Sequence, residues 1–407
     1  MMATMPRRYL LLLPLLFCDP NQFTTLYAKE VSKPELPAAS KTVLTVGQGK
    51  KFRLPSMAAQ VARDGDLVEI DAGIYEKDAA VWRQNNLTIR AVGNGRAHLK
   101  ADGVNAEGKA IWVIKGNNVT IENIEFSGAR VDDQNGAGIR LEGIGLTVRH
   151  CYFHDSETGI LGGSNPENEV LVEYTEFARN GSGDGSTHNI YVGEIKSFTL
   201  QYSYSHHAIV GHTVKSRARR NLILYNRIMD EADGRASYLV DICNGGQAFL
   251  IGNLIEQGPK AENFTIISYG AEGLKSPVNE LYVANNTIVN HRENGGIFVF
   301  VKAGTTAARL INNIFVGRGT VLEGPGEQQN NLVSEKAGLA NPGAYDFHLT
   351  QGSPAIDGGV APGSAAGFDL QPRFEYVHPL QKRPRPVVDK LDIGAYEFVR
   401  SGAATSR

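Results

Sequence analysis

The sequence predicts an all-β fold, a parallel β-helix with an N-terminal capping helix, and three observations lead to this prediction. A phrase of alternating apolar and polar residues recurs along the chain, its copies lie 24 to 33 residues apart, and 45 glycines supply frequent tight turns. Periods of this length are typical of solenoids, and units of short alternating strands stack into parallel sheets. Each copy should therefore form part of one coil.

The repeated phrase defines the expected stacking of the coils. Its copies are Val119–Phe126, Leu146–Phe153, Val170–Phe177, Phe198–Ser205, Leu222–Met229, Phe249–Glu256, Tyr282–Val289 and Leu310–Gly317. Equivalent positions carry Asn123, His150, Tyr174, Tyr202, Asn226, Asn253, Asn286 and Asn313. An Asn amide can donate to its copy in one neighbouring coil and accept from its copy in the other, because coils stack about 4.8 Å apart. We expect the last four to form an internal ladder at a turn.

The segments that flank the repeat differ from it. Ser56 is placed to begin a short helix through Ala62. That helix would cover the first coil, whose open edge would otherwise pair with another chain. We divide the chain into a signal peptide (1–28), a linker (29–45), the β-helix with its N-terminal cap (46–320), a C-terminal closing segment (321–398) and a disordered tail (399–407). Covered ends favour a monomer.

The first residues predict export. Two arginines precede an apolar run, Tyr9–Phe17, that is too short to span a bilayer and has the character of a secretory signal. We expect cleavage after Ala28 and a periplasmic or secreted protein. Phe17 is too large to precede a lipidated cysteine at Cys18, so no lipoprotein anchor is expected.

Composition excludes several classes of partner. The chain has 407 residues, 42% of them hydrophobic, which suffices for a large core, and a formal charge of −2. That charge gives no attraction to nucleic acid or a membrane surface, so neither is expected as a partner. Cys151 and Cys243 fall at different phases of the repeat, and we expect two buried thiols without a disulfide.

Two similar stretches, "HNIYVG" from His188 and "IVGHTVKS" ending at Ser216, predict a functional site. His188 and His212 each lie 14 residues before the equivalent positions Tyr202 and Asn226, and Tyr191 and Lys215 each lie 11 residues before them. Both pairs should therefore be stacked neighbours. With a one-residue shift, the next coil puts Tyr238 beside His212 and Asp241 beside Lys215.

Strand alternation sorts these residues into two faces. Inward parity belongs to Ile190, Val192, Val214, Val240 and Ile242, and outward parity belongs to Asn189, Tyr191, Thr213, Lys215, Arg217 and Asp241. His188, His212 and Tyr238 have inward parity but lie at strand starts, where a turn can expose them. A long flat face of this kind suits an extended polymer.

The polar set fits β-elimination on an acidic polysaccharide. This reaction needs a group that neutralises the uronate carboxylate, a base for the neighbouring proton and an acid for the departing glycosidic oxygen. Lys215 or His212 could be the base, with Arg217 as neutraliser and Tyr191 or His188 as acid. We expect Asn189, Tyr238, Asp241, Asn244 and Tyr269 to contact the substrate. His206 and His207 show no recognisable metal-ligand spacing, and no metal site is expected.

Four segments resemble known families. The opening block Gly65–Ala91 and the tail segments Asp346–Gly359 and Asp392–Phe398 resemble exported bacterial right-handed β-helix proteins with a pectate-lyase-like solenoid. Val214–Ile228 is similar to β-helix polysaccharide lyases of the alginate lyase and chondroitinase B type, which implies a role for Lys215 as base.

Two departures from that lyase pattern bear on the mechanism. Ala208 and Val210 replace the acidic calcium ligands that the resemblance implies, and "YLVDICNGG" replaces the strand with the acid-catalyst arginine. We therefore expect no cofactor, and calcium only if other ligands bind it.

Alternatives to a secreted polysaccharide lyase remain open from the sequence. A uronate C5-epimerase would share the base and the neutraliser. A glycoside hydrolase needs two carboxyl groups, which Asp241 with Glu272 or with Asp184 could supply. A non-catalytic carbohydrate-binding surface protein would use the same groove, with Lys215 and Asp241 as a simple ion pair.

Overall fold

The structure, a computed structural model, describes residues 41–386 and 388–399. The predicted signal peptide, linker residues 29–40 and tail residues 400–407 lie outside the described residues. Among the residues described, no helix has both the length and the apolar character needed to cross a membrane.

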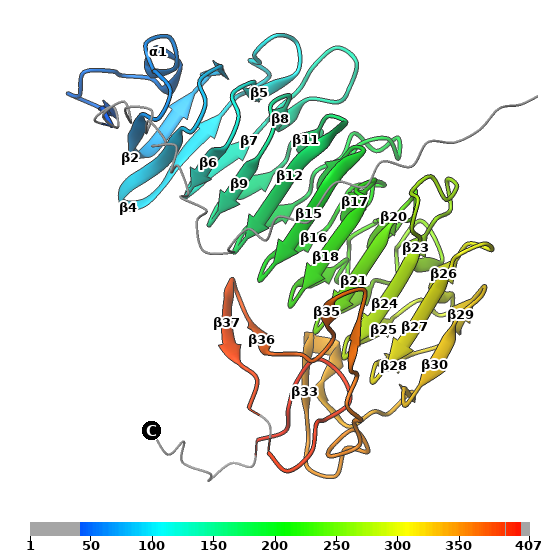
Figure 1. Cartoon of the computed structure of the whole chain (residues 1–407). Helices are drawn as coiled ribbons and strands as arrows, with labels where there is room; N and C mark the ends of the chain where they lie inside the picture. The colour runs from blue at the N-terminus through cyan, green and yellow to red at the C-terminus, as the bar shows by residue number, and fades with distance from the viewer. Residues whose placement is uncertain (1–40, 387, 400–407) are drawn as a thin grey trace, which may run out of the picture. The chain divides into compact units, whose positions relative to one another are not determined.

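The described chain is an all-β parallel solenoid in which three rows of strands run side by side (Figure 1). One row forms a 10-stranded parallel sheet: β3 (Ala80–Trp82), β5 (Ala110–Ile114), β8 (Ala137–Leu141), β11 (Thr158–Gly162), β14 (Ile190–Val192), β17 (Val214–Ser216), β20 (Val240–Ile242), β23 (Thr265–Tyr269), β26 (Ile297–Val301) and β29 (Thr320–Glu323). The predicted parallel stacking of coils is confirmed.

The other two rows lie on either side of the turn that the repeated phrase contains. The second row is β6 (Val119–Glu122), β9 (Leu146–Arg149), β12 (Asn165–Glu173), β15 (Ile195–Gln201), β18 (Arg220–Leu224), β21 (Gln247–Ile251), β24 (Glu280–Ala284), β27 (Ala307–Ile311) and β30 (Glu327–Gln329). The third row is β7 (Ile124–Ser127), β10 (Tyr152–His154), β13 (Glu176–Ala178), β16 (Tyr204–His206), β19 (Arg227–Met229), β22 (Leu254–Gln257), β25 (Thr287–Asn290), β28 (Ile314–Val316) and β31 (Leu332–Val333). The first coils use β1 (Val43–Val46) and two long strands, β2 (Leu67–Glu76) and β4 (Thr88–Lys100), and β4 pairs with both β6 and β7.

Alternation within the strands fills the interior. In β6 the side chains of Val119 and Ile121 are buried while Thr120 and Glu122 are partly exposed. Phenylalanines stack along the third row, with ring centroids 4.8 Å apart for Phe126 and Phe153 and 5.0 Å apart for Phe153 and Phe177. Such stacked pairs contribute about 0.5–1.5 kcal/mol each beyond the burial of their area.

The asparagine ladder forms as predicted and gains one rung. Each Nδ2 donates to the next Oδ1, at 3.0 Å from Asn226 to Asn253, 2.9 Å from Asn253 to Asn286, and 3.0 Å from Asn286 to Asn313. Asn313 donates in the same way to Asn331 at 3.0 Å. All of these amides lie inside the turn between the second and third rows.

The predicted equivalence of Tyr202 with Asn226 is wrong by one residue. Ser203 N donates to Asn226 Oδ1 at 3.0 Å, whereas the Tyr202 ring stacks on Tyr225 with centroids 5.8 Å apart. In the strands that lead into this turn the coil advances by 23 residues, from Phe198 to Asn221, although it advances by 24 from Tyr191 to Lys215 in the first row. The segment that connects the first row to the second is therefore one residue shorter in the coil of Lys215 than in the coil of Tyr191.

The predicted N-terminal helix is shorter than expected and begins earlier. Helix α1 is Pro55–Ala59 with Leu54 at the N-cap and no side-chain cap. Ser56, the predicted cap, instead donates its backbone N–H to Asp78 Oδ2 at 3.0 Å. Pro55 fits the first helical position because its missing N–H would have no partner there.

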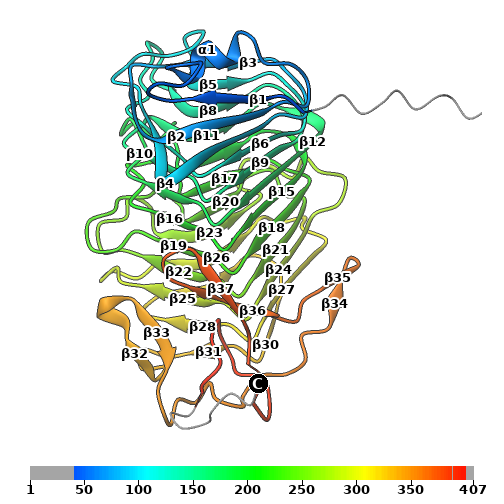
Figure 2. The same cartoon turned by 90° about the vertical axis from the view of Figure 1, so that its left-hand side faces the viewer.

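Residues after β31 lie against the outer faces of the last coils (Figure 2). They form three small antiparallel hairpins and a 3₁₀ turn: β32 (Leu339–Asn341), η1 (Pro342–Ala344), β33 (Asp346–Leu349), β34 (Ser364–Ala365), β35 (Phe368–Asp369), β36 (Phe374–Val377) and β37 (Gln381–Pro384). Phe347 and Tyr376 belong to the same buried hydrophobic cluster as Leu254 and Ile314 of the third row. The outer face of the third row is thus covered at its C-terminal end.

Both free cysteines are buried, as expected. Cys151 and Cys243 form no disulfide, and burial raises the pKa of each thiol to about 12. Neither thiol is therefore ionised near neutral pH.

Candidate active site

Strands β14, β17 and β20 bring the predicted site residues into register. Tyr191 lies opposite Lys215, and Lys215 lies opposite Asp241. Ser268 of β23 follows Asp241 in the next coil. The predicted side-by-side placement of Tyr191, Lys215 and Asp241 is confirmed, including the one-residue shift that the pairing of Lys215 with Asp241 requires.

Lys215 and Arg217 converge on one carboxylate. Lys215 Nζ lies 2.9 Å from Glu272 Oε1, and Arg217 Nη2 lies 2.6 Å from Glu272 Oε2. The Lys215 and Arg217 side chains are only 12% and 17% exposed, whereas the Glu272 side chain is 43% exposed. Both cations lower the pKa of Glu272, although burial opposes them. Glu272 is therefore an ionised carboxylate held by two partly buried cations.

Tyr191 and Asn244 fix the direction of the Arg217 guanidinium. Arg217 Nε donates to Tyr191 Oη at 2.7 Å, and Arg217 Nη1 donates to Asn244 Oδ1 at 2.5 Å. Lys215 Nζ lies 5.6 Å from the centre of the Tyr191 ring, which favours a cation there. We call Tyr191, Lys215, Arg217, Asn244 and Glu272 the basic cluster.

A surface pocket of about 410 Å³ adjoins the basic cluster. Arg217 and Asn244 line it together with Arg219, Lys275 and Glu194. Three of its charged residues are cationic and one is acidic, so the pocket favours an anionic ligand.

Asp241 lies beneath this surface and not on it. It is 2% exposed, and its Oδ1 has no hydrogen-bond partner among the residues that the structure describes. Burial raises its pKa to about 6, although Lys215 and Arg217 pull the other way. Its outward parity is correct, but the long side chains of the basic cluster cover it.

His188 and His212 stack as predicted, yet both are buried. Their ring centroids are 4.6 Å apart. Residue His188 is 2% exposed to solvent and residue His212 is 6% exposed. His188 Nδ1 accepts the backbone N–H of His212 at 3.0 Å, and His212 Nδ1 accepts that of Tyr238 at 3.3 Å. Burial lowers the pKa of both histidines, that of His212 to about 3. Each neutral ring therefore carries its proton on Nε2 and has no lone pair left for substrate, which argues against His212 as the base.

Like Asp241, the predicted substrate contacts Asn189 and Tyr269 are buried. Asn189 is fully buried and donates to Ser205 Oγ and to the backbone oxygen of His206. Alternation misplaced it, because β14 begins only at Ile190 and parity has no meaning in the preceding turn. Tyr269 is fully buried in register with Ile242, and its hydroxyl donates to Gly246 O at 2.5 Å. Tyr238 is half-buried beside His212, with ring centroids 4.9 Å apart.

Sequence reasoning gave too small a role to the loop residues. Glu272 was expected as a reserve acid or as a carboxyl group for hydrolysis, and Glu194 and Lys275 were not predicted at all. These residues follow strands β14 and β23 in irregular segments, where neither alternation nor repeat phase assigns a direction. The stretch "GAEGLK" after Tyr269 carries the only sequence signal, an acidic and a basic residue in a glycine-rich loop.

The basic cluster does not fit a calcium ion. Calcium takes six to eight oxygen ligands, mostly carboxylate and carbonyl oxygens. Here the carboxylate of Glu272 already faces two cations, and among the described residues the group of ligand-type side chains around it adds only Asp241 and the thiol of Cys243. Ala208 and Val210, at the positions of the acidic ligands in the resembling lyases, provide no ligand side chain.

Comparisons with known proteins support the fold. No protein-family model matches the sequence, and no curated protein does. The chain is similar to the crystal structure of pectate lyase Pel9A, with a TM-score of 0.59 and 11% identity over 88% of this chain and 97% of that one. It also matches an alginate lyase from Paenibacillus sp. str. FPU-7, with a TM-score of 0.48 and 13% identity over 70% of this chain and 99% of that one. At these identities the likeness to the pectate lyase shows a shared parallel β-solenoid fold.

Proposed function

We propose that this protein is an exported polysaccharide lyase that cleaves an acidic, uronate-containing polysaccharide at the basic cluster. The observation that carries this proposal is the convergence of Lys215 Nζ and Arg217 Nη2 on the single carboxylate of Glu272, beside a cationic pocket. Glu272 occupies the position that we assign to a substrate carboxylate. Structural neighbours named as pectate and alginate lyases agree with this substrate class.

The proposed reaction begins when a uronate carboxylate displaces Glu272. Glu272 is the most exposed member of the ion-paired set, so it can turn into solvent without unfolding a strand. Arg217, held by Tyr191 and Asn244, then binds the substrate carboxylate and stabilises the negative charge that develops next to it.

Lys215 is the proposed base. Once Glu272 has left, the Lys215 ammonium gives its proton to solvent and the resulting amine removes the proton on the carbon that bears the carboxylate. The electron pair then forms a carbon–carbon double bond, and the glycosidic carbon–oxygen bond breaks. Tyr191 is the proposed acid, because its hydroxyl lies within 2.7 Å of Arg217 Nε and its proton can pass to the departing oxygen. The products are one reducing end and one unsaturated uronate.

A glycoside hydrolase fits the geometry less well. Asp241 and Glu272 do place carboxylate oxygens within 4.8 Å of each other, near the spacing of about 5–5.5 Å in retaining hydrolases. Asp241 is buried beneath the cluster, however, and cannot flank a glycosidic bond in this conformation. Asp184, the other predicted partner, is committed to Ser182 and Ser186 in its own loop.

The test is a panel of uronate polymers supplied to wild type and to Lys215→Ala, with and without a chelator. We expect absorbance near 235 nm, roughly where unsaturated uronates absorb, to rise with wild type alone and to be insensitive to the chelator. Solvent deuterium in an intact polymer would show an epimerase instead, and reducing ends without unsaturation would show a hydrolase. Normal binding without any product in either protein would leave a carbohydrate-binding role.

A further inference from the structure

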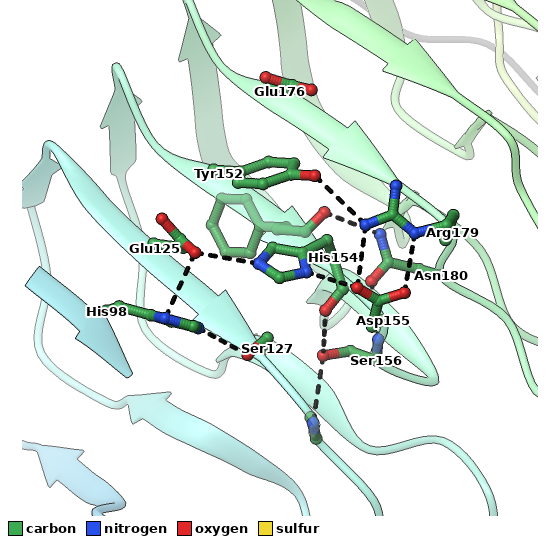
Figure 3. Close-up of polar contacts among 12 residues, drawn as sticks. His98, Glu125, Ser127, Tyr152, His154, Asp155, Ser156, Glu176, Arg179 and Asn180 are labelled. Carbon is green, nitrogen blue, oxygen red and sulfur yellow. Dashed lines mark hydrogen bonds and ion pairs between the residues drawn. The ribbon is translucent and has the colours of Figure 1, made fainter. Parts of the chain in front are cut away.

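A second polar cluster, shown in Figure 3, lies on the outer face of the third row and consists of residues that precede the basic cluster in the sequence. His98 of β4, Glu125 of β7 and His154 of β10 come from three successive coils, and Glu125 lies directly opposite His98. Their side chains are 20%, 23% and 14% exposed. We call these three residues the histidine cluster.

Three ligand-type atoms converge in the histidine cluster. His98 Nδ1 lies 3.3 Å from Glu125 Oε1, and His154 Nε2 lies 3.2 Å from the same oxygen. One such atom from each residue lies within 4.8 Å of both others. Ligands held at 2.0–2.1 Å around a tetrahedral zinc ion are about 3.3 Å apart. The side chains are therefore spaced as metal ligands without rearrangement of the backbone.

The remaining ring nitrogens are held from outside the cluster. His154 Nδ1 lies 2.6 Å from Asp155 Oδ2, and His98 Nε2 lies 2.7 Å from Ser127 Oγ. Arg179 donates to both oxygens of Asp155, from Nε to Oδ1 and from Nη2 to Oδ2, each at 2.9 Å. Histidines that bind metals are commonly oriented in this way, by a carboxylate or another acceptor on the second nitrogen.

The contact with Asp155 determines where the lone pair of His154 points. Because both oxygens of Asp155 accept from Arg179, His154 Nδ1 must be the donor to Asp155, which leaves the Nε2 lone pair of a neutral ring facing Glu125. His98 Nδ1 faces the same oxygen when Nε2 donates to Ser127. When both rings are neutral and both of these lone pairs face Glu125, one metal ion satisfies all three acceptors at once.

We propose that His98, Glu125 and His154 bind one divalent transition-metal ion, with zinc as the preferred ion. Two imidazoles and a carboxylate suit zinc better than calcium or magnesium, which prefer oxygen ligands alone. Three protein ligands leave a fourth position for water or a ligand atom. This site is separate from the basic cluster and does not depend on the proposed lyase activity.

Solvent can reach the histidine cluster from one side. Glu125 also lines a surface pocket of about 800 Å³, with Arg90, Arg96 and Arg149 among the other lining residues. Tyr152 covers the His154 ring on the other side, with stacked centroids 4.2 Å apart. The pocket opens the Glu125 side of the cluster to solvent.

The test is isothermal titration of chelator-treated full-length protein with zinc chloride and, separately, with calcium chloride. We expect one equivalent of zinc to bind and calcium not to bind. His98→Ala, His154→Ala and the isosteric Glu125→Gln should each lose this binding, and Asp155→Asn should weaken it by about 10- to 100-fold through the lost orientation of His154. Circular dichroism of each variant in chelator checks that the solenoid is intact.

Two variants serve as matched controls. Glu176→Gln alters a similar pair two coils further on, where His206 Nε2 lies 3.2 Å from Glu176 Oε1 but no third such ligand atom among the described residues completes a group. Glu272→Gln alters the second group of ligand-type side chains among the described residues, which also contains Asp241 and Cys243. Both should bind zinc like wild type. The proposal is overturned if wild type binds no zinc, if folded Glu125→Gln binds it normally, or if Glu272→Gln abolishes binding.

Discussion

Replacing Glu272 by glutamine removes the carboxylate that we propose competes with substrate for Lys215 and Arg217. Exposed ion pairs contribute about 0.2–1 kcal/mol each, and we take about 1 kcal/mol for each pair because both cations are less than one-fifth exposed. Displacing Glu272 thus costs about 2 kcal/mol in wild type. Since 1.4 kcal/mol corresponds to tenfold in affinity, Glu272→Gln should bind an acidic oligosaccharide about 10- to 30-fold more tightly.

The assay is titration calorimetry with an oligouronate and with a neutral oligosaccharide of the same length. Only the oligouronate should gain affinity, and the gain should shrink at high salt because exposed charges are screened. Glu194→Gln is the matched control, since Glu194 lines the same pocket but pairs with Lys275 at 3.8 Å through exposed side chains. It should change affinity less than about twofold. Equal or weaker binding by Glu272→Gln would refute the displacement step.

Three further predictions concern the scaffold and the buried residues. Asn253→Ala removes four hydrogen bonds of the ladder and should lower the unfolding free energy by about 3–4 kcal/mol in urea titrations; a loss under 1 kcal/mol would contradict the ladder. The pKa of Asp241 is raised to about 6, so the folded state binds more protons than the unfolded state between about pH 4 and 6, and stability should fall as pH rises through this range, by roughly 2–3 kcal/mol. In denaturant titrations at each pH, Asp241→Asn should not show this fall in unfolding free energy between about pH 4 and 6. The same fall in Asp241→Asn as in wild type would contradict the raised pKa of Asp241. Tyr269→Phe removes a buried hydrogen bond to Gly246 O and should lower the unfolding free energy by about 1 kcal/mol. It should leave kcat and KM unchanged, and a changed KM would indicate that Tyr269 contacts the substrate.

The regular part of the fold could be predicted from the sequence. Parallel coils place equal phases of a repeat side by side, so counting residues was enough to pair Tyr191 with Lys215, and counting with a one-residue shift paired Lys215 with Asp241. The same counting failed for Tyr202 and Asn226, because one residue is lost in the turn between two rows and a constant phase no longer holds.

The site was predictable only where its residues belong to strands. Lys215 and Arg217 follow from alternation, but their partner Glu272 lies in a loop whose path no periodic pattern describes. The histidine cluster escaped prediction for a different reason. Glu125 lies opposite His98 and Tyr152, while His154 lies opposite Ser127, so the contact between His154 and Glu125 is diagonal and depends on side-chain torsions.

The central claim is that the basic cluster binds the carboxylate of an acidic sugar, and a crystal structure of Lys215→Ala with a bound oligouronate tests it most directly. We expect one sugar carboxylate to accept from Arg217 where Glu272 now does, with the Glu272 side chain turned into solvent. An oligouronate bound elsewhere, with Glu272 still paired to Arg217, would contradict the account.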